Sequence, residues 1–453
     1  MSEDEKPDRY RAVPSSRLSR LSGFGKLAGG VAGGMLAEGA RKLAAGERPT
    51  LQELALTPGN AQRLTNQLSQ LRGAAMKLGQ MISLDAGDLL PPELSAILAT
   101  LRDQANFMPP RQLDKVLAEE WGKDWRRQFR RFEPRPIAAA SIGQVHRALT
   151  RDGDELAIKV QYPGVRDSID ADIDNVASLL RISGLLPKEL DIAPLLAAAK
   201  EQLHEEADYL REGEQMRLYA ERLAGERGFV VPRLYPDMTT RQVLVMSYET
   251  GEPIENLEAQ SQDVIDEVFG RLLSLVAREL FEFRVMQTDP NFANFRFRAD
   301  TQDIVLLDFG ATRPVEPRLS GAYRAMLTHG FAGEREKAVA AAVDSGFVNP
   351  VVLERHPDRV ERMTDVIMAE LTREEPFDFG DRAFVAVLRD EGMAIARDKA
   401  SWHLPPPEVV FVQRKVSGTA LLGARLKAVV DVRGRVEKVL ADSPPVTLTP
   451  TQD

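Results

Sequence analysis

The chain of 453 residues contains no cysteine and only five histidines. Without cysteine it has no disulfide, no thiolate metal ligand and no cysteine nucleophile. The histidines are scattered and no two have the spacing of metal ligands, which argues against a histidine-based metal site.

Long apolar runs are absent as well. No stretch reaches the roughly 18 apolar residues that a membrane-spanning helix needs, and the nearest candidate, residues 27–37, is too short. The acidic start, MSEDEKPD, is unlike a secretory signal. We expect a cytoplasmic protein, soluble or peripheral on the inner membrane, with no transmembrane segment.

What is present is globular composition, with 43% apolar and 28% charged residues. The net charge of −9 argues against nucleic acid as a partner. The length predicts two or three packed units. We expect a disordered basic tail (1–20), an N-terminal helical extension (21–125), a small lobe with a helical insertion (126–250), a larger helical lobe (251–440) and a C-terminal tail (441–453).

Two features mark the extension. Glycines recur every fourth residue between Gly25 and Gly34, which favours either a flexible linker or a close helix contact with a membrane, a partner or a second copy of the chain. Residues 64–82 carry an apolar stripe at helical spacing, with Lys77 and Gln80 on the opposite side.

Short strands are expected next. Residues 136–149 and 155–162 predict two strands joined by the polar turn TRDGD. Residues 166–226 are expected to be helical, and 229–235 and 241–249 to form two further strands. A strong helix is expected over 263–283, and 315–440 should be mostly helical.

The stretch IAAASIGQVHRA, residues 137–148, resembles the phosphate loop of protein kinases, G-x-G-x-x-G-x-V. Its four fixed positions hold Ala138, Ala140, Gly143 and Val145. Alanine resists positive φ, so we expect a stiffer loop that restricts backbone approach to phosphates.

Fourteen residues after Val145, the segment LAIK ends in Lys159, which matches the strand lysine of kinases in type and spacing. The segment QTDPNFAN then supplies Asp289 and Asn294 at the D-x-x-x-x-N spacing of a kinase catalytic loop. Fourteen residues beyond Asn294, an apolar run ends at Asp308 of LLDFG.

These residue types suit phosphoryl transfer. Asn294 and Asp308 offer oxygen ligands of the kind Mg²⁺ prefers, and Asp289 is a candidate to orient or deprotonate the attacking group. Kinases also pair the strand lysine with a helix glutamate. Sequence spacing does not choose among the candidates Glu205, Glu206, Asp208, Glu212 and Glu214.

Taken with KLGQ (77–80), AAAS (138–141) and EADYLRE (206–212), these motifs resemble the UbiB family of atypical kinase-like proteins, also called the ADCK family, which is linked to ubiquinone biosynthesis. The catalytic segment is similar to that of its mitochondrial branch. The resemblance covers about residues 20–430 and implies an α+β, bilobal kinase-like fold that uses ATP and Mg²⁺.

The resemblance also implies residue roles. Lys159 would pair with Glu212, and Glu206 with Lys77. Lys77, Gly79 and Gln80, together with Glu206 and Asp208, would be regulatory, because the extension would cover the peptide site. The residues implied for nucleotide contact are Ala138, Ala139, Ala140, Ser141, Gly143, Val145, Lys159, Met246 and Tyr248.

The chain departs from protein kinases at several positions. Gln287 and Thr288 replace the histidine and arginine before the catalytic aspartate, Asn291 replaces a lysine, and no Ala-Pro-Glu motif follows. These departures argue against a protein kinase.

Two functions stay open. One is a Mg²⁺-dependent ATPase or small-molecule kinase that supports ubiquinone or prenyl-lipid synthesis. The other is a nucleotide-gated scaffold or lipid-binding pseudokinase that organises biosynthetic enzymes at the membrane. Prenyl-phenol lipid, the membrane surface, ubiquinone-biosynthesis proteins and a second copy of the chain are the expected partners besides ATP.

Overall fold

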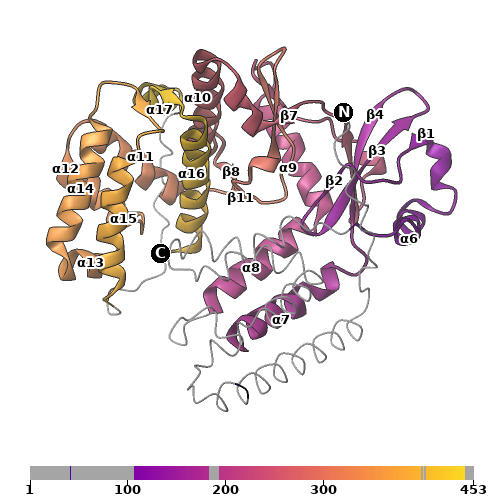
Figure 1. Cartoon of the computed structure of the whole chain (residues 1–453), viewed down its shortest axis with the longest axis horizontal. Helices are drawn as coiled ribbons and strands as arrows, with labels where there is room; N and C mark the ends of the chain where they lie inside the picture. Colours follow the sequence, from indigo (N-terminus) through magenta and orange to yellow (C-terminus); the bar gives the residue numbers. More distant parts are fainter. Residues whose placement is uncertain (1–40, 42–106, 183–192, 399–400, 402–404, 444–453) are drawn as a thin grey trace, which may run out of the picture. The chain divides into compact units, whose positions relative to one another are not determined.

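The computed structural model describes residues 41, 107–182, 193–398, 401 and 405–443 (Figure 1). The basic tail, the glycine-spaced segment and the KLGQ motif lie outside these residues. The chain divides into two compact units. The first comprises residues 1–214 and 233–248, and the second comprises 215–232 and 249–453.

A five-stranded antiparallel sheet forms the centre of the first unit, in the order β1-β3-β4-β6, with β2 added beside β3. Three longer helices follow its central hairpin in the chain. The elements are α6 (Pro110–Trp121), β1 (Phe129–Phe132), β2 (Ala138–Ala139), β3 (Gly143–Thr150), β4 (Glu155–Gln161), α7 (Ile169–Ile182), α8 (Ala193–Glu206), α9 (Tyr209–Arg222, shared with the second unit) and β6 (Val243–Ser247).

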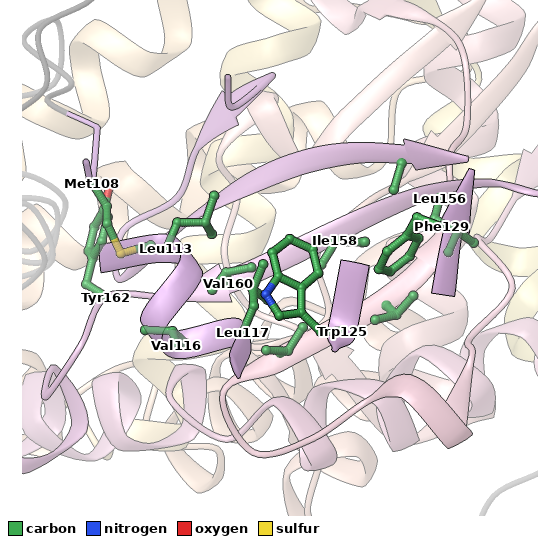
Figure 2. Packing of buried hydrophobic residues seen from close by; sticks show 13 residues of the cluster. Met108, Leu113, Val116, Leu117, Trp125, Phe129, Leu156, Ile158, Val160 and Tyr162 are labelled. Atoms are coloured by element: carbon green, nitrogen blue, oxygen red, sulfur yellow. The ribbon is translucent and has the colours of Figure 1, made fainter. Parts of the chain in front are cut away.

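The core of this unit lies between α6 and the sheet. Figure 2 shows Trp125 at its centre, near Leu117 of α6 and Ile158 of β4. The Trp125 ring meets Phe129 edge-on, with ring centroids 6.2 Å apart. Strand β4 is buried at every position except its first residue, so the charged Lys159 is held inside the unit.

The second unit is mainly helical, with one four-stranded sheet in the order β5-β10-β9-β7 and two strand pairs, β8–β11 and β12–β13. Its elements are β5 (Phe229–Val230), β7 (Glu252–Pro253), α10 (Gln262–Arg278), β8 (Val285–Gln287), β9 (Phe295–Arg298), β10 (Asp303–Leu306), β11 (Thr312–Pro314), α11 (Pro317–Phe331), α12 (Arg335–Asp344), α13 (Pro350–Arg355), α14 (Pro357–Leu371), β12 (Phe377–Asp378), α15 (Ala383–Ala396), α16 (Pro407–Leu426), β13 (Val429–Val430) and α17 (Val432–Asp442).

Local sequence explains many of these boundaries. Five helices (α6, α11, α13, α14 and α16) begin with proline in the first turn, where its fixed φ suits a helix and its missing N–H costs nothing. Helix α10 buries Ile265, Phe269, Leu272 and Val276, the three- and four-residue spacing of a helix packed on one face.

Three expectations need correction. The strand expected over 136–149 is two strands, because residues 140–142 form a turn that folds β2 back onto β3. The helix expected over 263–283 ends as a π-helical turn, Glu279–Phe283. The strands expected at 229–235 and 241–249 are β5 and β6, which belong to different units because β5 pairs with β10.

Within the described residues, no helix is both long enough and apolar enough to cross a membrane.

Candidate functional site

The alanine-rich segment forms the tip of a tight hairpin. Ala138 pairs with Val145, and the Ala140 N–H donates to the Gly143 carbonyl at 2.9 Å. A Cβ on Gly143 would lie 2.3 Å from the carbonyl oxygen of Val160 in β4. Glycine is therefore required at this position by close contact with the neighbouring strand, whereas Ala138 is exposed and free of such a restriction.

Lys159 forms a buried ion pair with Glu212. Its ammonium donates to the two carboxylate oxygens at 2.9 and 3.1 Å, and Glu212 is 0% exposed. The Lys159 ammonium also lies 5.2 Å from the ring of Tyr209. The pairing implied by the resemblance is thus present, and it fixes a cation in the first unit.

The structure distinguishes Glu212 from the other acidic candidates. Glu206 accepts a hydrogen bond from the Ser141 hydroxyl at 2.9 Å, so it contacts the alanine-rich segment. Asp208 accepts from the Arg211 N–H at the start of α9, Glu205 lies 3.6 Å from Arg211, and Glu214 is exposed. Glu212 is the candidate whose carboxylate accepts hydrogen bonds from the Lys159 ammonium.

Two of the residues expected to contact the nucleotide, Met246 and Tyr248, lie at the end of β6. Met246 is buried and pairs with Ala157 of β4. The Tyr248 N–H donates to the Glu155 carbonyl, and its ring stacks under the Arg147 guanidinium at 4.4 Å. Both are held by β4 and its hairpin, the same elements that carry Lys159.

In the second unit, the catalytic-loop segment follows β8. The backbone N–H and the side-chain hydroxyl of Thr288 both donate to the Ala311 carbonyl, at 3.0 and 2.8 Å. The Asp289 carboxylate accepts from the Asn291 N–H at 3.3 Å, and its carbonyl accepts from the Asn294 amide at 3.4 Å. The segment is therefore tied to the residues that follow the DFG motif.

Asn294 and Asp308 lie at the same end of the β9–β10 hairpin. Phe295 pairs with Leu306, and the Leu307 N–H donates to the Asn294 carbonyl at 2.9 Å. Phe309 is buried beside Tyr219, with ring centroids 5.1 Å apart, which anchors the motif. Both predicted metal ligands line one small cavity of about the size of a water molecule.

This donor set fits Mg²⁺. One carboxylate and one amide oxygen are the protein ligands that Mg²⁺ takes when substrate phosphates supply others. No cluster of three or more His, Asp or Glu side chains with metal-binding geometry occurs in the described part of the chain, so a separate, fully protein-ligated metal centre is not found there.

A buried polar network lies beneath this site and was not predicted from the sequence. The Tyr219 hydroxyl donates to the Glu279 carboxylate at 2.6 Å, and Lys415 lies 3.6 Å from the same carboxylate. Lys415 also donates to the Gln287 side-chain carbonyl at 3.2 Å. Burial raises the pKa of Glu279, while the charge of Lys415 opposes that rise. Tyr219, Glu279 and Lys415 belong to no motif that would single them out, although Gln287 is the first residue of QTDPNFAN.

The five-stranded sheet with its buried lysine–glutamate pair, followed by the second unit with its D-x-x-x-x-N and DFG segments, defines a kinase-like protein. The family profile of the ABC1 atypical kinase-like domain matches residues 100–342, and the chain belongs to this family.

Among its relatives is the atypical kinase COQ8, mitochondrial, of Saccharomyces cerevisiae. The two are 36% identical over 97% of this chain and 88% of that protein. The atypical kinase COQ8B, mitochondrial, of Rattus norvegicus is 37% identical over 94% of this chain and 80% of its own length.

One solved structure, that of Rv3197 from Mycobacterium tuberculosis in complex with erythromycin, shares the fold with a TM-score of 0.57. It is 23% identical and covers 84% of this chain and 95% of that chain.

Proposed function

We propose that the chain is an ATPase of the atypical kinase type, which binds ATP with Mg²⁺ and uses water as the phosphoryl acceptor. The observation that carries this proposal is the buried Lys159–Glu212 pair. A buried ion pair contributes little net stability, because the cost of desolvating the two charges offsets much of their attraction. A fixed lysine cation is instead well suited to bind nucleotide phosphates.

The other roles follow from the geometry of each unit. Asn294 and Asp308 would hold Mg²⁺, which neutralises negative charge on the transferring phosphoryl group. Asp289 would orient the attacking water and accept its proton. The alanine-rich tip (138–143) would cover the phosphates, and Met246 and Tyr248 would contact the base.

The replacements near Asp289 favour water over a peptide hydroxyl. Gln287 and Thr288 are buried and serve to hold β8 and the segment after DFG, as their hydrogen bonds show. Neither is placed to bind a peptide. Relatives that carry the COQ8 name support a role in ubiquinone or related prenyl-lipid synthesis at a membrane surface, and we extend that role to this chain.

The proposal is tested with Asp308→Asn, which keeps the side-chain shape but removes the ligand charge. We expect loss of Mg²⁺-dependent ATP hydrolysis by about 100-fold or more, since the metal ligand stabilises developing charge. Phosphate release from purified protein is the measurement.

Asp300→Asn is the matched control. Asp300 is exposed and its carboxylate accepts a hydrogen bond from the adjacent Thr301 N–H, so its removal should leave turnover unchanged. Hydrolysis with the parental rate and Mg²⁺ dependence in Asp308→Asn would contradict the proposal.

A further inference from the structure

Helix α16 contacts the catalytic segment on both sides of Asp289. The Lys415 ammonium donates to the side-chain carbonyl of Gln287, two residues before Asp289, at 3.2 Å. A Cβ on Gly418 would lie 2.1 Å from Cβ of Pro290, the residue directly after Asp289. Figure 1 shows α16 beside β8 and β11 in the same unit.

The contacting residues of α16 form one stripe. Phe411 lies under the Arg313 guanidinium at 4.0 Å, and Lys415 and Gly418 follow at the four- and three-residue spacing of a single helix face. Arg313 belongs to β11, which pairs with β8. One face of α16 thus contacts β8, which precedes Asp289, and Pro290, which follows it. The same face contacts β11, the strand that pairs with β8.

The charge at the centre of this stripe is held in place. Lys415 is 1% exposed, lies 3.6 Å from Glu279 and sits 5.4 Å from the ring of Phe295. The Tyr219 hydroxyl donates to Glu279 and accepts the Gln287 N–H at 2.9 Å. The backbone and the side chain of Gln287 are therefore both bound by the network that holds Lys415.

We infer that α16 is a positioning element for catalysis: Lys415 and Gly418 fix the backbone on either side of Asp289. The inference rests on the proposed ATPase function. Pro290 transmits the contact, because its ring is rigid and its nitrogen is bonded directly to the Asp289 carbonyl carbon. A side chain added at position 418 would therefore displace Asp289 along the backbone.

Gly418→Ala tests the inference. We expect kcat for ATP hydrolysis to fall by about 10- to 100-fold while KM for ATP stays within about twofold, because small misplacement of a catalytic group slows chemistry without removing binding contacts. A merely structural role would lower the folded fraction and leave kcat per folded molecule unchanged.

Two matched glycines on helices serve as controls. Gly423 lies on the same helix, and its Cβ would lie 2.5 Å from the Phe269 ring, so Gly423→Ala overpacks α16 away from Asp289. Gly392 on α15 has open space, so Gly392→Ala overpacks nothing. Both should keep the parental kcat per folded molecule.

Hydrogen–deuterium exchange of residues 285–294 provides a readout that does not need turnover. We expect faster exchange there in Gly418→Ala than in Gly423→Ala. If Gly418→Ala does not fold, the double variant Lys415→Met with Glu279→Gln removes the contact to Gln287 without leaving an unpaired buried charge, and the same loss of kcat is expected.

The outcomes separate the two claims. A parent protein without ATP hydrolysis would overturn the ATPase function, and the inference would then be judged on exchange alone. Parental kcat in Gly418→Ala, or exchange of 285–294 equal to that of Gly423→Ala, would overturn the positioning role of α16.

Discussion

At the scale of single residues, the alanines of the alanine-rich tip (138–143) and the glycine beside them differ in what restricts them. Gly143 is required by its contact with the Val160 carbonyl, whereas Ala138 is exposed at the hairpin tip. The residue types of the loop could be compared with the kinase pattern from sequence alone. The close approach of β4 to Gly143 could not, because it depends on the register of two strands.

Ala138→Gly should tighten nucleotide binding without unfolding the protein. Glycine removes a methyl group and permits positive φ, so the backbone can approach the phosphates more closely. We expect the Kd for ATP or ADP to fall by about threefold or more, measured by fluorescence titration, with thermal denaturation as the check on folding. Equal affinities for both nucleotides in parent and variant would count against this role of the loop.

His146 makes the stability of the first unit depend on pH. Its ring contacts the Glu133 carbonyl at 2.9 Å and the Gln144 amide at 2.8 Å, and burial lowers the pKa of His146 to about 4. The unfolded chain takes up this proton below about pH 6.5 and the folded chain only near pH 4. Between these values, falling pH therefore lowers the free energy of unfolding, by up to about 3 kcal/mol from this group.

The variant His146→Gln separates this contribution from that of the carboxylates. Urea denaturation at pH 7, 5.5 and 4.5 should show the stability advantage of the parent over the variant shrinking as pH falls. An advantage that stays constant across this range would contradict the assignment.

At the scale of elements, the hairpin β3–β4 and the strand β10, which ends two residues before Asp308, could be predicted, because apolar runs bounded by turn residues identify them locally. The π-helical turn after α10 and the placement of α16 could not. The turn carries Glu279, whose partner Lys415 lies 136 positions later, and no local pattern encodes such a pairing.

The Glu279–Lys415 pair should behave as a coupled unit. Lys415→Met should cost about 3–5 kcal/mol of unfolding free energy, because it leaves a buried carboxylate without its counter-charge. Adding Glu279→Gln should recover part of that loss, as measured by chemical denaturation in a double-mutant cycle. Arg433→Met, which breaks the exposed Arg433–Glu437 pair of α17, is the control and should cost less than about 1 kcal/mol.

If the loss of unfolding free energy in the double variant equals the sum of the losses in the two single variants, Glu279 and Lys415 are not coupled.

At the scale of the whole molecule, the kinase-like fold was predictable from the order of the motifs, since each motif belongs to a known place in that fold. The assignment of chain segments to the two units was less predictable from the sequence. Residues 215–232 belong to the second unit although they precede the last strand of the first, so the chain passes between the units three times. Strand β5, only two residues long, lies in residues 215–232 and joins this segment to the second unit by pairing with β10.

The central claim, that Asn294 and Asp308 hold the Mg²⁺ that accompanies ATP, is tested most directly by calorimetric titration of ATP with and without Mg²⁺. We expect Mg²⁺ to strengthen ATP binding to the parent by about tenfold or more, and to give no such gain in Asp308→Asn, because that substitution removes the charged metal ligand. ATP affinity in the parent that is the same with and without Mg²⁺ would contradict the account.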